Sequence, residues 1–384
     1  MTAYDFEERF DRRASGCNKW NRYPEDVLPM WVADMDIASP PAVIAALRAR
    51  LDHPVLGYGM ARGGLVARIV AWCAARYGWA VAPEQVVPLA GVVPGFNLAL
   101  RATCAPGAGV VVQPPVYPPM LTAPANWGLR RVEAPLSEDG KVEMGAFRAA
   151  LREAGGGAFL LCNPHNPTGR VFTRDELGAM AEACLAADTT IISDEIHCDL
   201  VFDGLPHIPI ASLSPAIAAR TITLMSAGKT FNVAGLAVCW AIIPDAGLRA
   251  RFQQAISGVS DHPNILGLIA TEAALAEGEP WRRALIAHLE ANRDALMEAV
   301  ATRLPGVRMR KPEGTYLAWL DFRDTPAAAD PAAFLLEHAR VGVNPGPDFG
   351  APGAGFVRLN FGCPRGLLQE GIARIEAALR GNGV

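Results

Sequence analysis

The middle of the chain alternates short apolar runs with longer stretches whose apolar residues recur at helical spacing. The short runs cover residues 86–90, 110–113, 158–162, 190–193, 221–225 and 236–243, and helical stretches such as 94–104, 144–154 and 173–187 lie between them. Short apolar strands separated by helices are typical of a mostly parallel sheet covered on both faces. We therefore predict an α/β fold that binds its ligand at the carboxyl ends of the strands.

The two ends of the chain show other patterns. Residues 1–39 have no long period, and helices are predicted over 40–51, 62–77 and, with a break near 278–280, over 263–303. Short strands (316–320, 356–360) then alternate with helices (331–340, 364–379), and the Pro/Gly-rich stretch 344–355 predicts a long loop. We expect an arm over 1–45 that belongs to a small domain, a large domain over 46–275, and a smaller α+β domain over 276–384.

Composition narrows the function classes. The chain is 51% apolar and 19% charged, as in soluble globular proteins, and its net charge of -4 differs from the basic footprint of a nucleic-acid binder. No apolar run is long enough to cross a bilayer, and the start resembles no signal peptide. The eight cysteines form no C-x-x-C pair, which argues against a zinc site and favours the cytoplasm. We expect no metal, membrane or nucleic-acid partner.

A lysine follows the apolar run 221–225. Lys229, in Ser226-Ala-Gly-Lys-Thr, would lie just beyond the carboxyl end of a strand, from where it can reach into a cleft. Desolvation there would lower its pKa and make the amine nucleophilic enough for a Schiff base. Taken alone, a solvated surface lysine is the commoner interpretation, and Ser226 could be a simple turn residue.

Three more polar segments follow strands in the same way. Asp194 could keep a pyridine nitrogen protonated or only cap a helix, and His197 could face the same site or be structural. Asn166 lies in the rigid turn Asn-Pro-His-Asn-Pro-Thr-Gly (163–169), where its amide could donate to a ligand oxygen. Residues 90–95 join a strand to a helix, and the amides of such a helix start suit a phosphate.

The order of these segments is more specific than any one of them. The series at 91, 166, 194 and 229 resembles the fold-type-I enzymes that use pyridoxal 5′-phosphate (PLP), the aspartate aminotransferase superfamily. The resemblance implies a large PLP-binding domain with a mostly parallel seven-stranded sheet. The strings at 29–36 (Pro-Met-Trp-Val-Ala-Asp-Met-Asp), 163–170, 193–197 and 229–232 further resemble the MalY/PatB group of cystathionine β-lyases, or cysteine-S-conjugate β-lyases.

For the cofactor, the resemblance implies a Schiff base on Lys229, a pairing of Asp194 with the pyridine nitrogen, and a hydrogen bond from Asn166 to the ring's 3-hydroxyl. His197, where many aminotransferases have tyrosine, would assist Asn166.

On the phosphate side, the resemblance implies that the backbone of Val92 and Val93 and the side chain of Ser226 hold the phosphate, while Tyr117 stacks on the ring. Many aminotransferases carry a second phosphate-binding arginine eight residues after the lysine. Ala237 stands there in this chain, which favours the lyase group.

For the substrate, the resemblance implies that Arg358 clamps the α-carboxylate through a bidentate contact, with Asn344 also on the substrate side. Tyr58 would reach the partner's site, which makes the active unit a homodimer with shared active sites. Lys229 would then abstract the Cα proton, and Tyr58 is a candidate to assist the leaving group.

The resemblance implies cleavage of cystathionine or another S-substituted L-cysteine by α,β-elimination, giving a thiol, pyruvate and ammonia. Two alternatives stay open at this point. A class I/II aminotransferase would use the same lysine, and a PLP-fold regulator would bind without catalysis, although the set of Lys229, Asp194, Asn166 and Arg358 disfavours the latter.

Overall fold

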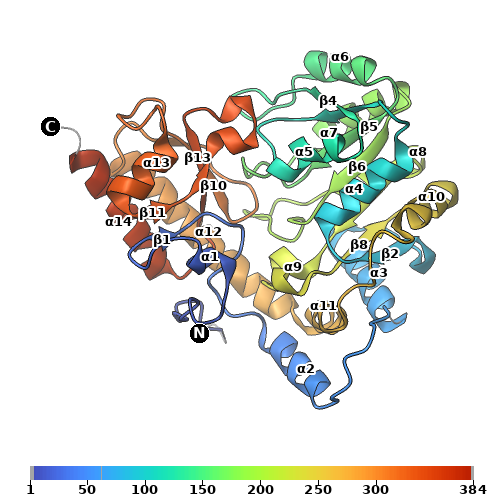
Figure 1. Cartoon of the computed structure of the whole chain (residues 1–384), viewed down its shortest axis with the longest axis horizontal. Coiled ribbons are helices and arrows are strands. Elements are labelled where there is room, and N and C mark those ends of the chain that lie inside the picture. Colours follow the sequence, from blue (N-terminus) through green and yellow to red (C-terminus); the bar gives the residue numbers. More distant parts are fainter. Residues whose placement is uncertain (1–3, 62, 382–384) are drawn as a thin grey trace.

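A seven-stranded sheet forms the centre of the larger half of the molecule (Figure 1). The computed structural model describes residues 4–61 and 63–381. In spatial order the strands are β2 (Val86–Leu89), β8 (Cys239–Ile242), β7 (Thr221–Met225), β6 (Thr190–Asp194), β5 (Ala158–Cys162), β3 (Gly109–Val112) and β4 (Arg130–Glu133). From β7 to β4 all neighbours are parallel, whereas β8 is antiparallel to both β7 and β2. The predicted α/β fold with a mostly parallel sheet is confirmed.

Helices cover both faces of this sheet, which explains why β3, β5, β6, β7 and β8 are buried along their whole length and together consist mostly of apolar residues. On one face α4 (Val92–Thr103), α5 (Pro118–Asn126) and α10 (Ala246–Ile256) share a core with Val110 and Val112. On the other face α6 (Met144–Ala154) and α7 (Arg174–Ala186) share a core with Val111. Alternate residues of one strand therefore contribute to two separate cores.

In Figure 1 most of the remaining elements lie to the left of this sheet or below it. Four antiparallel strands make a second sheet in the order β12 (Asn344–Pro345), β13 (Phe356–Asn360), β10 (Leu317–Asp321) and β9 (Arg308–Met309), and β1 (Leu28–Pro29) pairs with β11 (Val341–Gly342). The other helices are α1 (Asn18–Asn21), α2 (Pro41–Leu51), α3 (Gly63–Tyr77), α8 (Pro215–Ala218), α9 (Ala227–Thr230), α11 (Ile265–Glu277), α12 (Glu279–Thr302), α13 (Pro331–Phe334) and α14 (Arg365–Gly381). The predicted domain boundaries, after residues 45 and 275, stay predictions.

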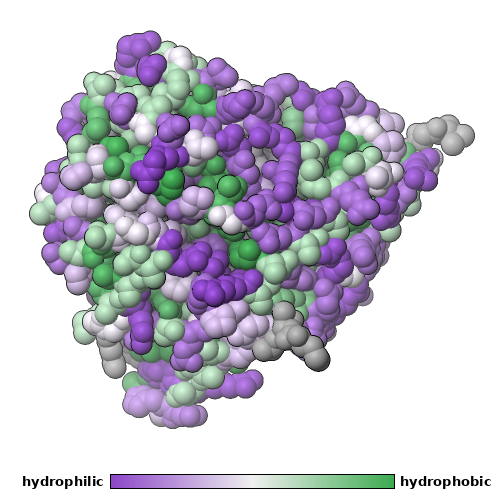
Figure 2. Space-filling view, turned by 180° about the vertical axis from the view of Figure 1, so that it is seen from behind, coloured by the Kyte–Doolittle hydropathy of each residue, from purple (hydrophilic) through white to green (hydrophobic). Residues whose placement is uncertain are grey.

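The back of the molecule mixes polar and apolar side chains (Figure 2). Polar side chains predominate over the half that contains the C-terminal elements, and apolar ones are scattered over the other half. Within the described residues, no helix combines the length and the apolar character needed to cross a membrane.

Three local features differ from the sequence-based expectations. Helix α4 begins at Val92 rather than Pro94, because proline is tolerated in the first turn of a helix. Strand β4 (Arg130–Glu133) was not predicted, since it is an edge strand with three exposed residues. The stretch 344–355 is not a plain loop, because β12 pairs with β13 and sets Asn344 opposite Arg358.

Candidate active site

A cavity of about 240 Å³ opens where β5, β6 and β7 end and α4 begins. It brings together nearly all the residues that the sequence singled out, which come from several different strand ends and loops. The predicted residues that line it are Val92, Val93, Tyr117, Asn166, Asp194, His197, Ser226, Lys229 and Arg358, with Ala237 beside them.

Lys229 lies on the single-turn helix α9, which Ser226 caps by accepting a hydrogen bond from the Gly228 amide at 2.9 Å. The Lys229 amine donates to the backbone carbonyl of Ala33 at 2.6 Å. Burial, assisted by the positive charge of Arg358, lowers the pKa of Lys229 from 10.5 to about 8. A sizeable fraction of the amine is therefore unprotonated near neutral pH, as a nucleophile or base requires.

Asp194 ends β6 with its carboxylate inside the cavity and only 4% of the residue exposed. Its Oδ1 accepts from the Ile196 amide at 3.1 Å, and in the part of the chain that is described no arginine, lysine or histidine forms an ion pair with it. Burial raises the pKa of Asp194 to about 7, although the Ile196 hydrogen bond and the charge of Lys229 pull it down. A carboxylate in this state can accept a proton or a cationic partner from a ligand.

Arg358 reaches the cavity from β13 and is 4% exposed. Its Nη1 donates to Asn166 Oδ1 at 3.0 Å, and its Nη2 donates to the Trp31 carbonyl at 2.9 Å and to Asn344 Oδ1 at 2.7 Å. All three acceptors are neutral, Nε has no hydrogen-bond partner among the described residues, and burial lowers the pKa of Arg358 to about 10. The guanidinium is thus held in place and still lacks an anion.

The same contact orients Asn166. Because its Oδ1 accepts from Arg358, its amide nitrogen is left to donate elsewhere, and Asn166 itself lines the cavity. The His197 ring meets Tyr316 edge-on with 5.9 Å between ring centroids. Burial lowers the pKa of His197 well below its usual value, so the imidazole is neutral. Its Nδ1 has no hydrogen-bond partner in the described part of the chain.

The residues predicted to bind the phosphate lie at or near the N-terminus of helix α4. Val92 and Val93 form the first turn of α4, whose free amides and positive dipole end suit an anion. The Ser226 hydroxyl, however, donates to the Val238 carbonyl at 2.7 Å, so it must turn before it can donate to a ligand. Tyr117 precedes α5 and lines the same cavity.

Tyr58 is the one predicted site residue that lies away from this group. It is 92% exposed, and its ring centroid is 6.2 Å from that of His262. With Leu56 and Leu266 it lines a different cavity, of about 360 Å³. Asn344 does not line the main cavity but contacts Arg358 directly.

Sequence reasoning missed the part played by the backbone at Val32 and Ala33. Both residues line the cavity, and the Ala33 carbonyl accepts from Lys229 and, at 3.0 Å, from the Tyr316 hydroxyl. The string at 29–36 indicates a functional segment only through the family resemblance, because the positions of backbone carbonyls leave no signal in the side-chain pattern.

The residues present fit PLP. A phosphate matches the start of α4, a ring nitrogen matches the unpaired carboxylate of Asp194, and an aldehyde matches the desolvated amine of Lys229. No group of three histidine, cysteine or acidic side chains arranged for a metal occurs within residues 4–61 and 63–381.

The fold and this set of side chains define a PLP-type enzyme with the aminotransferase fold. The chain belongs to the family described as aminotransferase class I and II, whose sequence profile matches residues 25–375. It is 39% identical to the cystathionine beta-lyase PatB of Bacillus subtilis, over 98% of this chain and all of the relative. It is also 34% identical to the protein MalY of Escherichia coli, over 98% and 99% of the two chains.

Among solved structures, cystalysin from Treponema denticola, described as containing a pyridoxal 5′-phosphate cofactor, superposes with a TM-score of 0.94. Its sequence is 32% identical, and the match covers 99% of each chain. The predicted membership in the MalY/PatB group is confirmed.

Proposed function

We propose that this chain is a PLP-dependent carbon–sulfur β-lyase that cleaves cystathionine or other S-substituted L-cysteines into a thiol, pyruvate and ammonia. The observation that carries the proposal is the meeting of Lys229, Asp194 and Arg358 in one cavity, where none of the three forms an ion pair within the described part of the chain. The similarity to PatB supports the choice of substrate class.

When bound, PLP supplies an electron sink that stabilises negative charge at the substrate's Cα. In this role Asp194 would face the ring nitrogen, Asn166 and His197 the 3-hydroxyl, the start of α4 with Ser226 the phosphate, and Tyr117 the ring. Lys229 would form the covalent link.

The protein's own part is to bind the substrate and move its proton. Arg358 would hold the α-carboxylate, and the unpartnered Nε gives it a free donor in addition to those shared with Asn166 and Asn344. This contact would place Cα near Lys229, whose amine would take the Cα proton and pass it to the thiolate that leaves Cβ, giving the thiol. Holding base and proton in one geometry supplies much of the rate gain.

An aminotransferase is the second candidate, favoured by the description of the family. It would use the same lysine, carboxylate and arginine. The two functions are separated by supplying cystathionine or S-methylcysteine without a 2-oxo acid and measuring pyruvate and thiol. A lyase forms both products, whereas an absolute need for a 2-oxo acid would overturn the proposal.

Two variants sharpen this assay. Lys229→Ala should abolish both the yellow absorbance of the holoenzyme and pyruvate formation, while Lys141→Ala, at an exposed lysine paired with Asp139, should change neither. Turnover that survives in Lys229→Ala would contradict the role given to the amine. A panel of S-substituted cysteines, scored for thiol release, then identifies the leaving group.

The active unit would be a homodimer. The segment around Tyr58 exposes a run of large apolar side chains, with Val55 64%, Leu56 56%, Tyr58 92% and Met60 77% exposed. Such a run is unfavourable in water and suits a second copy of the chain, into whose site Tyr58 would reach. All eight cysteines are free thiols, which supports a cytoplasmic enzyme.

A further inference from the structure

The backbone of Trp31–Ile37 accepts hydrogen bonds from both cationic groups that the proposed function uses. The Trp31 carbonyl accepts from Arg358 Nη2 at 2.9 Å, and the Ala33 carbonyl accepts from Lys229 Nζ at 2.6 Å. Only Val32 separates these two carbonyls along the chain. The position of this segment therefore sets the position of the guanidinium and of the amine together.

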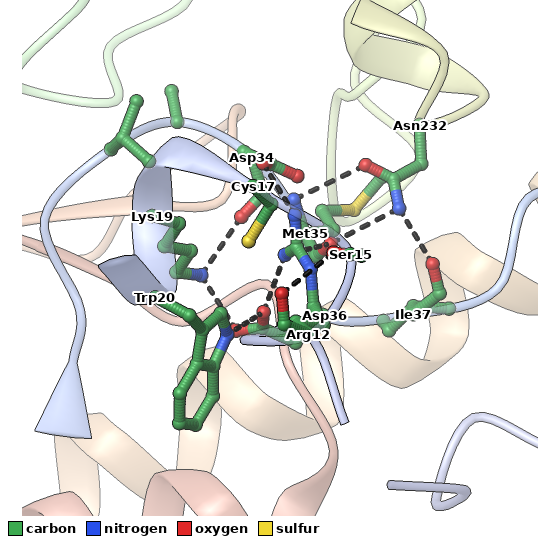
Figure 3. Close-up of polar contacts among 12 residues, drawn as sticks. Arg12, Ser15, Cys17, Lys19, Trp20, Asp34, Met35, Asp36, Ile37 and Asn232 are labelled. Atoms are coloured by element: carbon green, nitrogen blue, oxygen red, sulfur yellow. Dashed lines mark hydrogen bonds and ion pairs between the residues drawn. The ribbon is translucent and has the colours of Figure 1, made fainter. Parts of the chain in front are cut away.

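A buried carboxylate anchors the segment at its far end. Asp36, 6% exposed, accepts from Lys19 Nζ at 2.6 Å, from Arg12 Nη1 at 2.5 Å and from Trp20 Nε1 at 2.8 Å. Figure 3 shows these three side chains meeting at Asp36. Lys19 is 1% exposed and also donates to the Asp34 carbonyl at 2.9 Å, so the anchor holds backbone as well as side chain.

A second anchor comes from the lysine's own loop. Asn232, three residues after Lys229, accepts from the Met35 amide at 3.2 Å and donates to the carbonyls of Met35 at 3.1 Å and Ile37 at 2.6 Å (Figure 3). Its φ of 53° lies in the left-handed region, which asparagine tolerates better than most residues. The loop that carries Lys229 is thus bonded to the segment through Lys229 itself, at Ala33, and through Asn232, at Met35 and Ile37.

We propose that Asp36 is a positioning residue, which holds Trp31–Ile37 so that the Ala33 carbonyl aims the Lys229 amine and the Trp31 carbonyl aims the Arg358 guanidinium. The inference rests on the proposed function for the roles of Lys229 and Arg358. Asp36 touches neither of them, and acts through the backbone between. An amine that has just taken up a proton keeps an acceptor at Ala33, and a displacement of about 1 Å at such a site can cost about 100-fold in rate.

The test compares two variants with a matched control. Asp36→Asn removes the charge of the first anchor, and Asn232→Gly removes the second while keeping a residue that accepts a positive φ. The control is Asp321→Asn, at a carboxylate that is 7% exposed and bonded to Arg308 and Arg323 but does not contact the segment.

Three measurements are made on each variant. Hydrogen–deuterium exchange of peptides covering residues 27–38, and the rate at which an amine-specific reagent labels Lys229, are followed in the cofactor-free chain. The holoenzyme gives kcat and KM. We expect faster exchange, a labelling rate changed at least threefold, a kcat lower by about 10- to 100-fold and a raised KM in both variants, with the Asp321→Asn control unchanged in all of them.

The proposal is overturned if exchange in residues 27–38 rises while Lys229 labelling, kcat and KM stay within twofold of the parent. It is equally overturned if the control changes the same quantities as much. Should Asp36→Asn fail to fold, the milder Trp20→Phe, which removes one of the donors to Asp36, decides the matter by the same criteria. Exchange and labelling need neither PLP nor substrate, so they remain decisive even if the chain proves not to be a lyase.

Discussion

Replacing Asp194 by asparagine should stabilise the cofactor-free chain at pH 8. Burial raises the pKa of Asp194 from 3.8 to about 7, so the folded state holds this proton where the unfolded chain has already lost it. The stability that protonation gives is fully present below about pH 4 and is lost as the pH rises through about 7. A shift of about three units corresponds to about 4 kcal/mol at pH 8.

The stability gained by Asp194→Asn is smaller than this, because the substitution also removes the attraction between the carboxylate and the ammonium of Lys229. We therefore expect Asp194→Asn to raise the free energy of unfolding by about 2–4 kcal/mol at pH 8 and to change it little at pH 4. Urea unfolding of both cofactor-free chains between pH 4 and pH 8 measures the difference. Glu182→Gln, at an exposed carboxylate, is the control and should show no such pH dependence. An Asp194→Asn chain that is equally or less stable than the parent at pH 8 would refute the reasoning.

Three further results are expected. Labelling of Lys229 in the cofactor-free chain should have a midpoint near pH 8, because burial and Arg358 lower its pKa from 10.5 to about 8. A midpoint near pH 10.5 would contradict this. Arg358→Lys should raise KM for the amino acid by about 10- to 100-fold, since a single ammonium cannot replace a bidentate guanidinium. An unchanged KM would show that Arg358 does not bind the substrate's α-carboxylate. If Tyr58 serves the partner's site, mixing an inactive Lys229→Ala chain with a weakened Tyr58→Phe chain should form hybrid dimers in which one site lacks both groups and the other is intact. Each hybrid dimer should show about the activity of one normal site, and activity no higher than that of the unmixed variants counts against shared sites.

The strands of the sheet could be predicted because a strand that is buried on both faces consists mainly of apolar residues, which form a short run in the sequence. Ala158–Cys162 is apolar throughout and Thr221–Met225 is apolar apart from two threonines, and the structure has buried strands with those same bounds. The edge strand β4 escaped prediction since only Val132 among its residues is buried. A strand that is mostly exposed to solvent has few apolar residues and therefore leaves no apolar run in the sequence.

The candidate site was predictable for a topological reason. Residues that follow parallel strands must meet at one edge of the sheet, so Asn166, Asp194 and Lys229 had to be neighbours once the strands were recognised. Contacts made by backbone atoms could not be predicted in this way. Nothing in the identity of Ala33 indicates that its carbonyl accepts from Lys229, and nothing in Ser226 indicates that its hydroxyl is already bonded to Val238.

The electrostatics of the cavity make it a site that is completed by its ligand. Burial shifts the pKa of Lys229, Arg358 and Asp194 toward their neutral forms, so each group destabilises the cofactor-free fold. A ligand that is anionic at one end and carries a protonatable ring nitrogen offsets part of this unfavourable free energy. Burying the Asp194 carboxylate destabilises the cofactor-free fold, and the pairing of that carboxylate with the ring nitrogen would stabilise the complex. The free energy that Asp194→Asn gains without PLP should therefore reappear as weaker PLP binding, by about 30- to 1000-fold for 2–4 kcal/mol. Equal affinity in the two chains would mean that the carboxylate and the ring nitrogen do not interact.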